Sequence, residues 1–291
     1  MPLSALVLVL VAAFLHAAWN LLAKRAGAAG TVFVWCTATL STLLWAPVAI
    51  GVDGAALASL SASIWACVAA SALIHVLYFV ALLRAYALAD LSVVYPVARG
   101  TGPLLAALAA LAFLGEALGA IGSMGLAMIV AGTFTIAGGF ALLRGARSPR
   151  VLQGLGWGAL TGLTIAAYTI NDGYAVRELG APPLLFDWLG IAGRALLLAP
   201  FAWAFRARLR PALRSDWRVI LAVAVLSPAA YILVLYAMTL APVSRVAPAR
   251  ELSMLVATLF GARLLGEPDM WRRLIGAALI AGGVACLSLG S

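Results

Sequence analysis

Ten long apolar segments occupy most of this chain of 291 residues and constrain its fold more than any other feature. A helix needs about 20 apolar residues to cross the hydrocarbon core of a bilayer. The segments that meet this length approximately are residues 3–22, 31–50, 64–83, 92–113, 120–142, 152–175, 184–204, 219–240, 247–265 and 273–290. They predict an all-α integral membrane protein with ten transmembrane helices.

The composition excludes a water-soluble globule. Hydrophobic residues make up 65% of the chain and charged residues 10%, whereas soluble domains carry about 25% charged residues. The net charge of +9 does not indicate a nucleic-acid partner, because the basic residues stand in short clusters between apolar runs. Such clusters are typical of topology signals and of lipid headgroup contacts, so the predicted surroundings are the lipid bilayer.

The arginine distribution predicts the orientation. The segment from Met1 to Ala5 has no Lys or Arg and the apolar run after it is too long for a signal peptide, which indicates a retained first helix. Loops after odd-numbered helices contain Lys24, Arg25, Arg84, Arg144, Arg147, Arg150, Arg206, Arg208, Arg210, Arg214, Arg218, Arg272 and Arg273. Loops after even-numbered helices contain only Arg177 and Arg245. The positive-inside rule therefore places both termini outside the cytoplasm, in a multi-pass protein of the inner or plasma membrane.

Two halves of the chain resemble each other. Residues 85–96 read AYALADLSVVYP, and residues 237–248, offset by 152, read AMTLAPVSRVAP. One residue is then lost, so that Ala98-Arg99 matches Ala249-Arg250. In each half a Leu-Gly-Glu follows, with Glu116 and Glu267 each standing 17 residues after the arginine. Ordered matches at Pro, Arg and Leu-Gly-Glu favour a duplication over the chance similarity of two Ala/Leu-rich helices.

The duplication predicts the domain organisation. We expect a first repeat over residues 1–143, a cytoplasmic linker over residues 144–151 and a second repeat over residues 152–291. Five spans per repeat is an odd number, so the two repeats enter the membrane in opposite senses. Inverted repeats place a binding site near the bilayer midplane, and one half rocking against the other gives alternating access.

The sequence resembles the drug/metabolite transporter superfamily, of the ten-helix EamA-like type. The resemblance covers nearly the whole chain and depends on the Pro-containing starts of the fourth and ninth spans, the Leu-Gly-Glu after each, and the Gly-rich fifth and tenth spans. Residues 15–20, LHAAWN, and residues 168–173, YTINDG, are typical of one branch. The resemblance implies two EamA-like repeats, secondary transport of small solutes and a central cavity lined largely by the first, third, fourth, sixth, eighth and ninth spans.

Arg99 and Arg250 are the strongest candidates for substrate binding. They occupy equivalent repeat positions, and a guanidinium holds carboxylate or phosphate through two parallel hydrogen bonds. The alternative is that each is neutralised structurally or reaches an interface. Glu251 can pair with Arg250, bind a substrate amine or carry a coupling proton. It can also meet Arg99, because adjacent residues on a helix point about 100° apart.

Three further residues are candidates for carrying a coupling proton: His16, His75 and Asp172. Ionisable groups inside spans cost about 2.5–3.5 kcal/mol on insertion scales, so each is a functional candidate. For all three the alternative is a structural hydrogen bond or ion pair. Asp187 and Arg194 stand seven residues apart on one helix face, which favours a charge network.

Aromatic and polar residues complete the predicted substrate site. Tyr95, Tyr168 and Tyr231 are candidates for lining it with rings and hydroxyls. Trp19 and Asn20, with His16 one turn before, form a polar stripe with an aromatic wall on the first span. Glu116 and Glu267 are expected to organise the tight connections after the fourth and ninth spans.

The sequence favours a transporter over an enzyme. It has no phosphate-binding loop, no metal-ligand cluster and no nucleophile–base spacing, and Cys36, Cys67 and Cys286 are not spaced as a metal or redox motif. We therefore expect no cofactor, no metal and no catalytic residue. The predicted function is alternating-access transport of a small polar solute, anionic or zwitterionic, with proton-coupled export as one form. The alternative is a lipid-headgroup flippase or an intramembrane lipid-handling enzyme. The sequence leaves monomer and homodimer open.

Overall fold

A computed structural model describes residues 1–25, 30–88, 91–136, 149–256 and 270–289. Within these ranges the chain forms helices and no strand. The helices of the first half are α1 (Leu3–Arg25), α2 (Thr31–Asp53), α3 (Ala62–Leu88), α4 (Leu91–Phe113) and α5 (Ala120–Ile136). Those of the second half are α7 (Pro149–Arg177), α8 (Pro183–Ala204), α9 (Leu209–Leu240), α10 (Val243–Ala249) and α12 (Met270–Leu289). Two short 3₁₀ helices, η1 (Gly54–Ser59) and η2 (Arg206–Arg208), lie between them.

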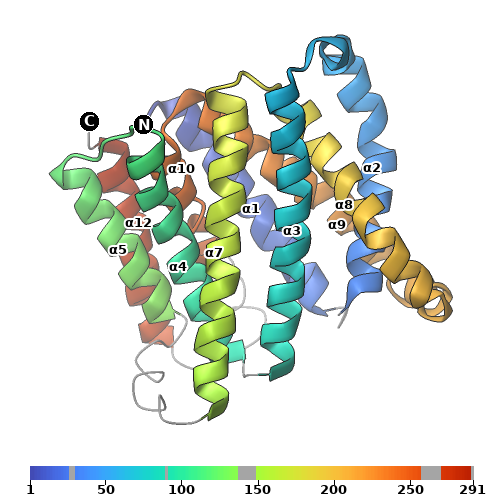
Figure 1. Ribbon diagram of the computed structural model, residues 1–291. Coiled ribbons are helices and arrows are strands. Elements are labelled where there is room, and N and C mark those ends of the chain that lie inside the picture. Colours follow the sequence, from blue (N-terminus) through green and yellow to red (C-terminus); the bar gives the residue numbers. More distant parts are fainter. Residues whose placement is uncertain (26–29, 89–90, 137–148, 257–269, 290–291) are drawn as a thin grey trace.

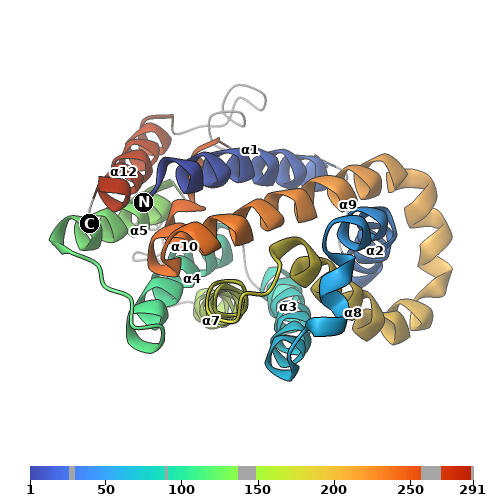
Figure 2. The same ribbon diagram turned by 90° about the horizontal axis from the view of Figure 1, so that it is seen from above.

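The long helices run side by side, and the two chain ends lie at the same end of the bundle (Figures 1 and 2). The amino group of Met1 donates a hydrogen bond to the carbonyl of Ser288 at 2.8 Å, which ties the start of the chain to the end of α12. The turn between α8 and α9, which contains η2, lies at the opposite end of the bundle (Figure 1). The termini therefore share one face, as the predicted topology requires.

Five described helical stretches are long and apolar enough to cross a membrane: Leu3–Ala23, Thr31–Ser59, Ala62–Ala85, Pro183–Ala204 and Leu213–Leu240. Val97–Phe113, Ala120–Ile136 and Leu274–Leu289 are apolar but shorter. The chain is thus a multi-pass membrane protein. The exact number of ten spans stays a prediction, because residues 137–142 and 257–265 lie outside the described part of the chain. The domain boundary near residue 144 does too, although α7 begins at Pro149, inside the predicted linker.

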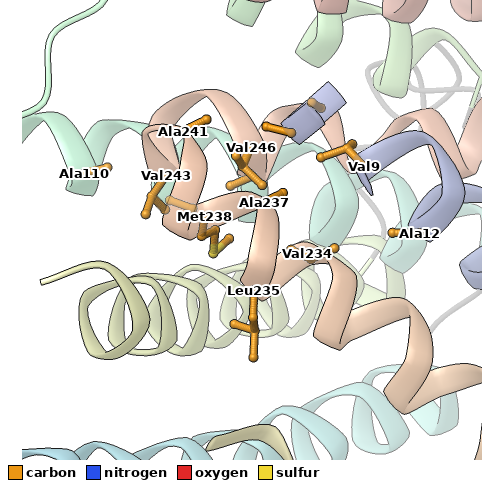
Figure 3. Packing of buried hydrophobic residues seen from close by; sticks show 14 of the residues in the cluster. Val9, Ala12, Ala110, Val234, Leu235, Ala237, Met238, Ala241, Val243 and Val246 are labelled. Atoms are coloured by element: carbon orange, nitrogen blue, oxygen red, sulfur yellow. The ribbon is translucent and has the colours of Figure 1, made fainter. Parts of the chain in front are cut away.

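The core lies where the two halves meet. The side chains of Val9 and Ala12 on α1 pack with Val234, Leu235 and Met238 on α9 (Figure 3). Many large apolar side chains instead face outward, among them Leu196 on α8 and Phe113 on α4, at 75% and 81% exposure. Outward apolar surface of this kind suits lipid as solvent.

Glycines allow α5 and α12 to approach backbone to backbone. A Cβ added to Gly125 would lie 2.6 Å from the carbonyl oxygen of Gly283, and one added to Gly132 would lie 2.6 Å from that of Gly276. Shifting Gly125 and Gly132 by 151 residues gives Gly276 and Gly283, so each glycine contacts the counterpart of the other. A two-fold axis produces this reciprocal pattern. The helix pairs repeat it, since α1 packs on α9 and α7 packs on α3.

The predicted continuous span 247–265 is wrong at its start. α10 ends at Ala249, Arg250 and Glu251 form a turn, and helix resumes at Leu252. The Glu251 N–H then bonds the Pro248 carbonyl, three residues back instead of four, at 3.0 Å.

Candidate functional site

Arg250 lies at the helix break and is held by α7 and α9. Its Nη2 donates to the Tyr168 hydroxyl at 3.3 Å and its Nη1 to Thr169 Oγ1 at 3.4 Å. The guanidinium carbon also lies 6.0 Å from the ring centre of Tyr168 and 5.7 Å from that of Tyr231. Among the described residues no carboxylate lies within 4.0 Å of this guanidinium. Arg250 is therefore a cation surrounded by rings and hydroxyls.

Glu251 links Arg250 to the first half of the chain. Its Oε1 lies 3.4 Å from Arg99 Nη1 on α4, and its side chain is 2% exposed. Its Oε2 is buried and accepts no hydrogen bond. Of the alternatives that the sequence left open, the structure shows pairing with Arg99. The three residues together carry two positive charges and one negative charge.

Tyr168 is the centre of an aromatic cluster beside Arg250. The His75 ring stacks on it with 4.1 Å between ring centres and 23° between planes. Tyr78 and Tyr231 meet it edge to face at 6.0 and 6.1 Å. Nδ1 of His75 lies 2.8 Å from the Ser71 carbonyl, to which its N–H can donate. His75 and Tyr78 of α3 thus both face Tyr168 on α7.

Asp172 is fully buried behind the tyrosines and both its oxygens accept hydrogen bonds. The Tyr231 hydroxyl donates to Oδ2 at 2.7 Å and the Asn171 amide donates to Oδ1 at 2.9 Å. Asn171 also donates to the Cys67 carbonyl on α3 at 2.9 Å. Sequence reasoning placed Asp172 and Tyr231 in the site separately but missed their bond, because 59 residues separate them and only helix packing brings them together.

Asp187 and Arg194, for which the sequence favours a charge network, form an ion pair within α8. Asp187 Oδ1 lies 3.8 Å from Arg194 Nη2, beyond hydrogen-bond distance, and the Asp187 side chain is 3% exposed. Asp187 Oδ2 and Arg194 Nε are buried without hydrogen-bond partners.

The candidates on α1 divide into two groups. The charges of Arg250 and Arg99 both act on the His16 ring, whose Nδ1–H can donate to the Ala12 carbonyl at 3.2 Å. The ring centres of Trp19 and His16 lie 5.9 Å apart, and the buried Trp19 Nε1 has no hydrogen-bond partner among the described residues. Asn20 is exposed and donates to the His16 carbonyl at 2.7 Å, so the structure does not bring it to the arginines. Tyr95 lies in α4, but its side chain is not among those that the structure describes.

Glu116 connects the two halves at the other end of α10. Gly115, with φ of 64°, ends the turn after α4 in a conformation that favours glycine. The Glu116 carboxylate then accepts the N–H of Val243 at Oε1 and that of Ser244 at Oε2, both at 2.7 Å. The predicted role in a local connection was too narrow, since Glu116 caps a helix of the second half. Glu267 lies outside the described residues.

No group of His, Cys, Asp and Glu in the described part of the chain is arranged to hold a metal ion. The site has charged, hydroxyl and aromatic groups from both halves of the chain. It is suited to binding a charged solute and to holding protons.

Comparison with known proteins identifies a family. Residues 152–289 match the EamA-like transporter family. No curated protein matches the chain. Among solved structures, 28 chains match. One of them, a crystal structure, is 20% identical in sequence with a TM-score of 0.75, and the match covers 99% of this chain and 98% of that chain. At this identity the likeness shows the fold alone.

Proposed function

The chain belongs to the EamA-like transporter family of the drug/metabolite transporter superfamily, so it is a membrane transporter of small molecules, and we propose that its substrate carries a carboxylate. This solute is an anion or a zwitterion. The proposal depends on Arg250, whose guanidinium has rings and hydroxyls around it and no carboxylate partner within the described ranges.

A partly buried guanidinium that has no carboxylate within 4.0 Å among the described residues favours an anionic ligand. Its planar donor fork matches a carboxylate, and charge-assisted hydrogen bonds are stronger than neutral ones. Tyr168 and Tyr231 hold the fork against their ring faces, which orients it before any ligand arrives. Arg99 supports the same region through Glu251 and adds to its positive potential.

Glu251 favours a zwitterion within this class. Its Oε2 is buried without a donor while Oε1 pairs with Arg99. A substrate amine next to the bound carboxylate would supply that donor. An amino acid has both groups on one carbon, so it can address Arg250 and Glu251 together.

The arrangement of the two halves supports alternating access. Reciprocal contacts between Gly125 and Gly283 and between Gly132 and Gly276 support a two-fold relation of inverted repeats. The helix break at Arg250 and Glu251 is a further feature of transporter sites, where unwound backbone meets the substrate. We propose export from the cytoplasm across the inner membrane, driven by protons.

Counterflow in proteoliposomes tests the substrate class. Vesicles loaded with an unlabelled mixture of proteinogenic amino acids receive the same mixture in radiolabelled form outside. We expect labelled solute to accumulate transiently in vesicles with the wild-type protein. Arg250→Ala should reduce the rate by about tenfold to a hundredfold, because a hydrogen bond to a charged group contributes about 1.5–3 kcal/mol.

Arg177→Ala is the matched control. Arg177 is the last residue of α7, the helix that carries Tyr168, but its side chain is 30% exposed and pairs with Glu178 at 3.5 Å. The proposal is wrong if Arg250→Ala transports as fast as this control. It is also wrong if parallel vesicles move only uncharged solutes, or if a fluorescent phospholipid changes leaflets while no amino acid moves.

A further inference from the structure

A second group of buried ionisable residues is linked to Arg250 through Tyr231. The Tyr231 ring lies against the Arg250 guanidinium, and its hydroxyl donates to Asp172. Asp172 and the Asp187–Arg194 pair act on one another electrostatically. We call Asp172, Asp187 and Arg194 the acidic triad.

The acidic triad has an uncompensated negative charge. The triad holds two carboxylates and one guanidinium, and both aspartates are buried, at 0% and 4% exposure. A buried charge without a partner is costly, so such a group gains one positive charge or one proton.

The hydrogen bonds distinguish the two carboxylates. Both oxygens of Asp172 accept from donors, Tyr231 and Asn171, which satisfy its ionised form. Asp187 has no such donor in the part of the chain that the structure describes: Oδ1 lies 3.8 Å from Arg194 Nη2, and Oδ2 has no hydrogen-bond partner there. A proton on Oδ2 would remove the unsatisfied charge at the place where it is least compensated.

The helices packed against α8 provide few competing groups. α3 contributes His75 and Cys67, and the His75 Nδ1 is engaged by the Ser71 carbonyl. α9 contributes Tyr231, whose hydroxyl is committed to Asp172, and Tyr236, which packs in one cluster with Leu184 and Trp188 of α8. α2 has Cys36, which packs with Ile220, and Asp53, its last residue.

We propose that Asp187 binds the coupling proton of this transporter. The inference rests on the proposed function and adds the ion to it. The proton adds to Oδ2 and converts the carboxylate to a carboxylic acid, which leaves Asp172 and Arg194 as a balanced pair. A substrate carboxylate that binds Arg250 adds a negative charge to the Arg99–Glu251–Arg250 group. Tyr231, which touches both groups, couples the two events. Asp187 thus takes the role that the sequence suggested for His16, His75 or Asp172.

Infrared spectroscopy of the purified protein tests the assignment without a substrate. We expect the wild type at neutral pH to show the C=O stretching band of a protonated carboxyl group, and Asp187→Asn to lose it. Glu178→Gln is the control, because Glu178 is 47% exposed and should not contribute such a band. A band that survives in Asp187→Asn, or is missing from the wild type, overturns the proposal.

Arg194→Gln keeps the test decisive if Asp187→Asn does not fold. Removing the guanidinium leaves Asp187 with no cation nearby on α8, so the band should persist to a more alkaline pH than in the wild type. An unchanged pH of disappearance would show that the protonated group is not the partner of Arg194, and the proposal would fail.

Transport separates this inference from the proposed function. In vesicles with the labelled amino acid mixture, a gradient of one pH unit should drive about tenfold accumulation through the wild type, because one unit per proton is about 1.4 kcal/mol. The quantity compared is the accumulation of label with the pH gradient, divided by the accumulation in counterflow without a gradient. For Asp187→Asn this ratio should fall to about one. A wild type with no counterflow contradicts the proposed substrate class, whereas a variant that keeps the tenfold ratio contradicts only the proton site.

Discussion

The Arg99 guanidinium on α4 lies 3.4 Å from the Glu251 carboxylate, and the pair joins the two halves of the chain beside the broken helix. Glu251 is 2% exposed and its other oxygen has no donor. Arg99 therefore supplies the compensation that this buried carboxylate depends on. The same contact fixes Glu251 relative to its neighbour Arg250. A structural ion pair and the proposed substrate-binding residue therefore share one turn of backbone.

Arg99→Ala should destabilise the folded protein. Removing one partner of a buried ion pair leaves the other charge uncompensated, at a cost of about 3 kcal/mol. We expect a clearly lower melting temperature in detergent. Adding Glu251→Gln should restore most of the loss, because the stranded charge is then gone. If the double variant melts no higher than Arg99→Ala, the destabilisation does not come from Glu251.

The sequence predicted the helices well and the side-chain network only in part. Apolar length placed the start of α2 and the end of α4 to the residue, because the cost of exposing backbone in lipid leaves few alternatives. The helix break was not predictable from proline alone. Pro96 and Pro248 are equivalent in the repeat, yet α4 continues past Pro96 while α10 ends one residue after Pro248.

The contacts of the site depend on how the helices are rotated against one another. Arg99 and Arg250 occupy equivalent positions in the repeat, but their contacts differ. Arg99 forms an ion pair with Glu251, whereas Arg250 lies over the rings of Tyr168 and Tyr231. Equivalent positions predict related places and do not decide which counter-charge each takes. The bond from Tyr231 to Asp172 likewise needed coordinates, since neither residue has a motif that specifies the other.

Glu116→Ala should loosen α10 and weaken substrate binding. The carboxylate accepts the first two N–H groups of that helix, and losing a helix cap costs about 0.5–2 kcal/mol. We expect a lower melting temperature together with a higher KM for the labelled amino acids, because α10 positions Arg250. Glu116→Gln retains one acceptor oxygen, so its melting temperature and KM should lie between those of the wild type and Glu116→Ala. Glu178→Ala, which removes an exposed carboxylate, is the control and should change neither quantity.

Gly125→Ala should destabilise the α5–α12 contact. The added methyl would lie 2.6 Å from the Gly283 carbonyl oxygen and 2.9 Å from the backbone nitrogen of Leu287, and neither backbone atom can move without shifting a helix. Overpacking of this kind costs about 1–3 kcal/mol. Gly156→Ala, where nothing lies within 4 Å of the new Cβ, is the matched control. Melting in detergent should separate the two variants, and equal melting temperatures would contradict the close approach.

Cysteine labelling should show the η2 end of the bundle in the cytoplasm. Arg206, Arg208 and Arg218 are exposed there and lie over Trp203, Phe205 and Trp217, the combination of basic and aromatic residues expected at a cytoplasmic interface. In a chain without its native cysteines, Ala58→Cys reports on η1, at the end of the termini, and Ala207→Cys reports on η2 (Figure 1). A membrane-impermeant maleimide added to intact cells should label the first and not the second. Inverted membrane vesicles should reverse the result, because the positive-inside rule leaves the arginine-rich end on the side of synthesis. Labelling of Ala207→Cys from outside intact cells would reverse the proposed orientation and with it the direction assigned to export.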